Sequence, residues 1–147
     1  MTLEKLSPRA AELTRREWRE LGFFYDLDDE TKEWRLTGSR KGLMAFSRLL
    51  ADYSAKPSND SLSEHDHFGP HMYLEVMTWD KANITSHAIE GTLADIARLA
   101  GIVERSLGLV QSGRIFIREE YTPDAEYSIV LDVREDGFDP ASLDPQL

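Results

Sequence analysis

Three of the four histidines of this 147-residue chain lie close together, at His65, His67 and His71, and Glu64 directly precedes them. Imidazole nitrogen and carboxylate oxygen atoms are ligands that Zn²⁺ takes from proteins. In an extended backbone His65 and His67 project to the same side, and a turn at residues 69–70 would bring His71 back toward them. These four residues are therefore a candidate site for zinc or another divalent metal.

The histidine segment also fits two other interpretations. Its spacing matches no established zinc motif, such as two histidines four positions apart on a helix. A polar loop whose histidines form local hydrogen bonds before a strand would have the same sequence, as would a loop that responds to pH or contacts a substrate. A metal-binding protein or metal-dependent hydrolase that uses His65, His67 and His71 is thus one of two functions to consider.

Catalytic motifs of other kinds are not found in the sequence. The chain has no cysteine, which excludes thiol nucleophiles and thiolate metal ligands, and no G-x-S-x-G sequence to present a serine. The segment 38–42 begins a helix and carries two basic residues, but it lacks the remainder of a phosphate-binding loop. Acidic pairs such as residues 28–29 fall in turns, where solvated charge explains them. We therefore predict no catalytic residue and no cofactor other than the alternative metal, and the sequence has no motif for an enzyme activity apart from the metal-dependent alternative.

The charge of the chain limits its partners. It has 17 basic and 27 acidic residues and a formal net charge of −10. A field of that sign repels nucleic acids and anionic membranes and attracts basic partners, although it also keeps a protein soluble. We expect no nucleic-acid partner and consider a basic protein partner.

The expected location is the cytoplasm. No segment has the roughly 18 to 20 apolar residues that cross a bilayer, and residues 1–9 lack the apolar run of a secretory signal. The absence of cysteine agrees with a reducing compartment. We therefore expect a cytoplasmic protein that does not associate with a membrane.

Cap residues and apolar periodicity predict one α+β domain over residues 1–147. Ser7 followed by proline marks a helix start, and Gly22 marks its end. The expected segments are an N-terminal helix at 7–21, a strand–strand–helix unit at 23–54, a second such unit at 71–107, a final hairpin at 113–134 and a tail at 135–147. Together they predict about six mostly antiparallel strands in one sheet, with two amphipathic helices on one face and the extra N-terminal helix.

The two strand–strand–helix units resemble each other. Each predicted helix follows a Gly-Ser or Gly-Thr pair, and placing Leu43 on Leu93 also places Phe46 on Ile96. The similarity indicates a duplicated β-β-α unit, while its short length leaves chance as the alternative.

A surface for a partner is predicted on the strand that follows the histidines. Tyr73, Met77 and Trp79 share one strand face, opposite Leu74 and Val76. Exposed aromatic and methionine side chains are typical of interfaces, unless another segment of the chain folds over them. These three residues are the candidate partner-binding site, and a second copy of the chain in a two-fold dimer would cover them.

Several blocks of the sequence resemble those of a group of small bacterial proteins: residues 16–23, 63–74 and 136–140. The helix start G-S-x-x-G-L at 38–43, followed by a histidine-bearing strand, is similar to families classed as immunity proteins of bacterial polymorphic toxin systems. The resemblance implies a small acidic α+β protein that binds and blocks a toxin domain without chemistry of its own. It assigns no role to any single residue. An immunity-like binding protein is therefore the first function expected.

Overall fold

The structure is a computed structural model that describes residues 5–147. Its first helix, α1 (Pro8–Leu21), begins where the Ser7 hydroxyl accepts a hydrogen bond from the Ala10 N–H. It ends at Gly22, whose φ of 98° lies in the left-handed region that favours glycine. The backbone of Gly22 packs directly on Gly42, so that a Cβ atom at residue 42 would collide with the Gly22 carbonyl. The end of α1 is thereby held against the start of the next helix.

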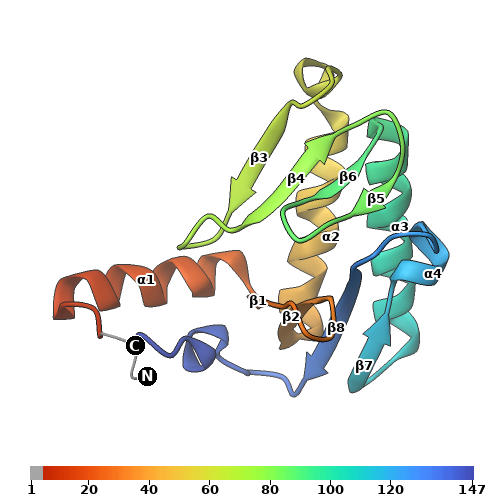
Figure 1. Cartoon of the computed structure of the whole chain (residues 1–147). Helices are drawn as coiled ribbons and strands as arrows, with labels where there is room; N and C mark the ends of the chain where they lie inside the picture. Colours follow the sequence, from red (N-terminus) through yellow and green to blue (C-terminus); the bar gives the residue numbers. More distant parts are fainter. Residues whose placement is uncertain (1–4) are drawn as a thin grey trace.

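Eight strands of the described residues form two four-stranded sheets (Figure 1). Sheet A has the order β1 (Phe24–Asp28), β2 (Glu33–Ser39), β8 (Ser128–Arg134), β7 (Gly113–Phe116). Sheet B has the order β3 (His65–Phe68), β4 (Leu74–Thr78), β6 (Ile89–Gly91), β5 (Asn83–Ile84). In each sheet the central pair is parallel and the two outer pairs are antiparallel. Both sheets are therefore mixed and follow one plan.

The two long helices, α2 (Arg40–Ala55) and α3 (Leu93–Leu109), lie side by side behind the strands and run in opposite directions (Figure 1). The α2 helix follows β2 with Ser39 as its cap, and α3 follows β6 with Thr92 as its cap. Three short elements complete the described part of the chain: α4 (Arg118–Tyr121) and the 3₁₀ turns η1 (Pro57–Asn59) and η2 (Pro140–Leu143). None of the described helices combines the length and the apolar character needed to cross a membrane.

The plan shared by the sheets comes from a repeat of the form β-β-α-β-β. The first copy is β1-β2-α2-β3-β4, and the second is β5-β6-α3-β7-β8. Each sheet takes one hairpin from each copy, so the copies exchange hairpins. Aligning the caps Ser39 and Thr92 pairs the buried helix positions: Leu43 with Ile96, Phe46 with Leu99, Ser47 with Ala100 and Leu50 with Val103.

The alignment of the helix caps Ser39 and Thr92 is shifted by about one helical turn from the alignment of Leu43 with Leu93 that the sequence suggested. A direct contact supports the structural one, because the Ser47 hydroxyl donates a hydrogen bond to the Ala100 carbonyl at 2.8 Å. The equivalent positions of the two helices therefore meet where α2 and α3 pack together.

The predicted α+β class is confirmed, whereas the prediction of a single six-stranded sheet is wrong. The segment 65–68, which lies between the two predicted strand–strand–helix units, forms the strand β3. The expected pairing within residues 71–107 also differs, since β4 pairs with β6 in parallel and β5 forms the hairpin with β6. Parallel pairs join residues distant in sequence, and β2 pairs with β8 in this way. Local patterns carry no information about such neighbours.

One continuous core joins the helices to both sheets. Leu74 and Val76 of β4 are fully buried, as are Leu36 of β2 and Leu131 of β8. The intervening residues of β4 are only half-buried, because strand side chains alternate between faces. The outer face of sheet B is thus available for a site.

Candidate functional site

A cleft of about 680 Å³ opens where α1, β1 and the C-terminal tail meet the β3–β4 hairpin. Its lining residues come from both sheets, from α1, from the β5–β6 loop and from residues 144–146. Figure 1 shows the turn between β3 and β4 close to α1, at the left of the molecule. The volume lies in the usual range of small-molecule sites, about 300 to 1,000 Å³.

Aromatic side chains form one wall of the cleft. Trp18 packs against Phe24 and Tyr25, with ring-centre distances of 4.7 and 5.0 Å, and Tyr25 lies 6.5 Å from Trp34. Trp18, Tyr25 and Trp34 are buried, and the Trp34 indole N–H donates to the Thr85 carbonyl at 2.8 Å. These contacts fix the rings, so the wall is formed before a ligand arrives.

Tyr25 also connects the sheets at the cleft. Its hydroxyl donates to the Phe68 carbonyl at 2.8 Å and accepts from the Tyr73 N–H at 3.2 Å. Gly69, with φ 87°, lies so close to the Tyr25 ring that a Cβ atom would collide with it. Burial raises the pKa of Tyr25, and the hydroxyl therefore remains a neutral donor. The β3–β4 turn is held in one position by a residue of the other sheet.

Asp144 closes the cleft from the C-terminal tail. Its carboxylate accepts hydrogen bonds from the Trp18 indole at 2.9 Å, from His71 Nε2 at 3.1 Å and from the Gln146 N–H at 2.9 Å. Burial of Asp144 raises its pKa, but these three hydrogen bonds and the His71 charge outweigh burial, and the net pKa is below the ordinary value. The carboxylate is fully engaged in holding the tail.

Two other carboxylates line the cleft: that of Asp26, which is exposed, and that of Glu75, whose side chain is 17% exposed. Desolvation beside the cleft raises the pKa of Asp26. The positive charge of Arg35 lowers this pKa in part, and the negative charge of Asp28 raises it further. Of the described residues that line the cleft, none is lysine or arginine. The cleft is consequently a negative environment with an aromatic wall.

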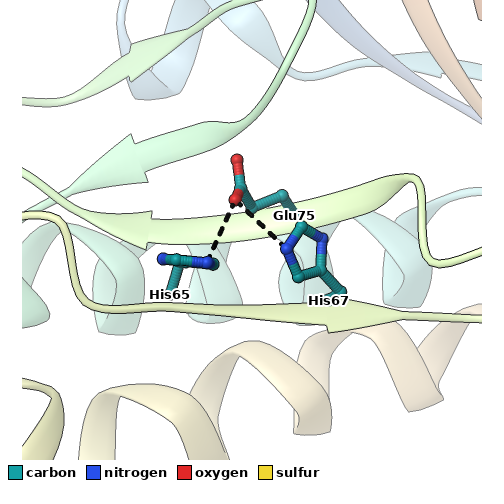
Figure 2. Close-up of side chains that lie close together, drawn as sticks. All are labelled: His65, His67 and Glu75. Atoms are coloured by element: carbon teal, nitrogen blue, oxygen red, sulfur yellow. Dashed lines mark ion pairs between the residues drawn. The ribbon is translucent and has the colours of Figure 1, made fainter.

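A second group of side chains lies at the margin of the cleft, on the outer face of sheet B. His65 and His67 project from β3 toward Glu75 of β4, which is the direct cross-strand partner of His67. Figure 2 shows both imidazoles directed at one carboxylate. Glu75 Oε1 lies 3.7 Å from His65 Nε2 and 3.5 Å from His67 Nε2. His67 and Glu75 also line the cleft.

His65 has a further partner. Its Nδ1 lies 2.9 Å from the Ser63 carbonyl. This hydrogen bond raises the pKa of His65, burial lowers it slightly, and the charge of Glu75 raises it further. The Nδ1 atom therefore carries the hydrogen, and Nε2 faces the carboxylate.

The structure changes the predicted metal set. His65 and His67 lie close together as expected, whereas His71 is outside this group and is hydrogen-bonded to Asp144. Glu75 takes the place that sequence analysis gave to Glu64. The signal that would have identified Glu75 is strand pairing, because a hairpin turning at residues 69–73 places residue 75 opposite residue 67.

The three predicted partner-binding residues do not form one apolar patch. Tyr73 is 69% exposed and belongs to the rim of the cleft, and Trp79 is 38% exposed beyond the other end of β4. Met77 is half-buried between them, and Glu75 separates it from Tyr73. Binding of a second copy through this face stays a prediction, which sedimentation of wild type and Trp79→Ala would test.

Comparisons of the chain with models of protein families, with curated proteins and with solved structures find no match. The resemblance to immunity proteins therefore stays a prediction. The features that bear on function are the cleft and the histidine–carboxylate group.

Proposed function

We propose that the protein is a binding protein whose cleft takes a compact organic cation with an aromatic or aliphatic body. The observation that supports this most strongly is the combination of an ordered aromatic wall with two lining carboxylates and no lysine or arginine among the described lining residues. Such a cleft favours positive charge and apolar surface in the same ligand. It requires no catalytic group of the protein.

Three physical effects act in the same direction. A cation over an exposed aromatic ring, here that of Tyr73 at the rim, gains about 0.5 to 2 kcal/mol, depending on how far water is excluded. Asp26 and Glu75 add direct attraction, and the net charge of −10 raises the concentration of cations near the surface. Because hydrogen bonds and packing already hold Trp34 and Tyr25, binding loses little side-chain entropy.

Titration with tetraphenylphosphonium tests the assignment. We expect saturable quenching or a shift of tryptophan fluorescence, since Trp18 and Trp34 line the cleft. Asp26→Asn or Glu75→Gln should each weaken binding by about fivefold to tenfold, because one partly solvated charge pair contributes on the order of 1 kcal/mol. Asp52→Asn, an exposed carboxylate on α2 outside the cleft, is the matched control. Equal affinity in all four proteins would contradict the assignment.

A protein partner is the second candidate, in the immunity-like role that the sequence suggests. It is favoured by Tyr73, which is 69% exposed at the cleft rim, and by the acidic charge of the chain. In this case the cation in the cleft would be an arginine or lysine side chain of a basic toxin domain. Co-expression with toxin-like neighbours of its gene tests this role. A toxin that is neutralised, and that tetraphenylphosphonium displaces, would support it.

A further inference from the structure

We infer that His65, His67 and Glu75 form a binding site for a divalent metal ion of the zinc type. Their three ligand atoms lie within 4.8 Å of one another on the outer face of sheet B. Metal binding at this site does not require that the cleft bind a cation, although Glu75 belongs to both.

The distances are close to those of a metal centre. With zinc–ligand bonds of about 2.1 Å, two ligands of a tetrahedron are about 3.4 Å apart. Glu75 Oε1 is 3.5 Å from His67 Nε2 and 3.7 Å from His65 Nε2. These two pairs are therefore near bonding geometry, and the ligand atoms of His65 and His67 lie within 4.8 Å of each other.

The hydrogen bond of His65 supports this use of the ring. A histidine that binds metal usually donates its other ring N–H to a carbonyl or carboxylate, which fixes the tautomer. His65 Nδ1 makes such a contact with the Ser63 carbonyl at 2.9 Å. In the neutral ring the lone pair of His65 Nε2 is then directed at the Glu75 carboxylate. This lone pair and those of the carboxylate oxygen repel each other unless a positive charge lies between the two atoms. A metal ion or a proton on Nε2 satisfies this arrangement (Figure 2).

The supporting strands make the group rigid. His67 and Glu75 are direct cross-strand partners, and on either side of Glu75 the side chains of Leu74 and Val76 are fully buried in the core. The positions of the Glu75 and His67 backbones are thus fixed by the sheet. Two imidazoles and one carboxylate leave a coordination position open in a four-coordinate zinc site. Since His67 and Glu75 line the cleft, the ion would lie at its margin.

Zinc binding by tag-free protein tests the inference. Isothermal titration with Zn²⁺ should show one site per chain in wild type. His65→Gln, His67→Gln and Glu75→Gln should each weaken binding on the order of 100-fold or more, since loss of even a second-shell contact costs about 10- to 100-fold. His87→Gln and Glu64→Gln are the controls, because they remove an imidazole and a carboxylate that are outside the group.

Co²⁺ distinguishes a metal centre from protonated histidines that pair with Glu75. Four-coordinate Co²⁺ gives intense visible absorption, and we expect this spectrum in wild type and in both controls but not in the three ligand variants. Circular dichroism of each variant verifies the fold. Zinc affinity that is unchanged by the ligand substitutions, or a weak octahedral Co²⁺ spectrum in folded wild type, would overturn the inference.

Discussion

The Trp18 indole N–H donates a hydrogen bond to the Asp144 carboxylate at 2.9 Å, across 126 positions of the chain. His71 donates to the same oxygen, so that α1, the β3–β4 turn and the C-terminal tail meet at one buried group. The tail thereby becomes a wall of the cleft, and stability of the fold is linked to the shape of the site.

Asp144→Asn should destabilise the protein by about 2 kcal/mol. The residue Asp144 is 5% exposed and its carboxylate receives three hydrogen bonds, and a bond to a charged group contributes about 1.5 to 3 kcal/mol. Urea unfolding measures the change. The control is Asp136→Asn, an exposed residue of the same tail, for which we expect less than about 0.5 kcal/mol. Equal midpoints for the two variants would contradict this role of Asp144.

The free energy of unfolding of the wild type should fall more steeply in acid than that of the Asp144→Asn variant. The folded-state pKa of Asp144 is below its ordinary value of about 3.9. Its contribution is therefore complete above about pH 4 and is lost as the pH falls through the lower, folded-state pKa. Urea midpoints measured from pH 7 down to about pH 3 should converge for wild type and the variant. Parallel profiles would show that another group controls the acid loss.

Gly42→Ala should destabilise the contact of α1 with α2. The added Cβ atom would collide with the Gly22 carbonyl, and such overpacking costs about 1 to 3 kcal/mol. Gly101→Ala, in the interior of α3 with no atom near the added methyl group, should instead stabilise by up to about 1 kcal/mol. Thermal unfolding of both variants compares the two glycines. A stabilised Gly42→Ala protein would contradict the packing described.

Zinc and the organic cation should oppose each other. A metal ion at Glu75 adds positive charge to the wall of the cleft and neutralises one of the carboxylates that attract the ligand. Tetraphenylphosphonium should therefore bind less tightly when zinc is present, and by linkage zinc should bind less tightly to the complex. The double variant His65→Gln/His67→Gln should lose this effect. Unchanged affinity in wild type with zinc demonstrably bound would contradict the coupling.

Local chemistry explains which parts of the structure could be predicted. Ser39 and Thr92 cap their helices through side chains a few residues from the hydrogen bonds they accept, so the helix starts are visible in the sequence. The pairing of β2 with β8 depends on residues almost a hundred positions apart and leaves no local pattern. Glu75 was missed for a different reason: its pairing with His67 is local, but it requires that residues 65–68 form a strand in register with β4.

Paired titrations with tetraphenylphosphonium and tetraphenylborate test the central claim most directly. The two ions have nearly the same size and shape and opposite charge, so apolar contact with the aromatic wall is matched and only the charge differs. Tryptophan fluorescence should report saturable binding of the cation and at least about tenfold weaker binding of the anion, because Asp26 and Glu75 lie in the cleft without a lysine or arginine among its described lining residues. Equal affinities, or tighter binding of tetraphenylborate, would contradict the account.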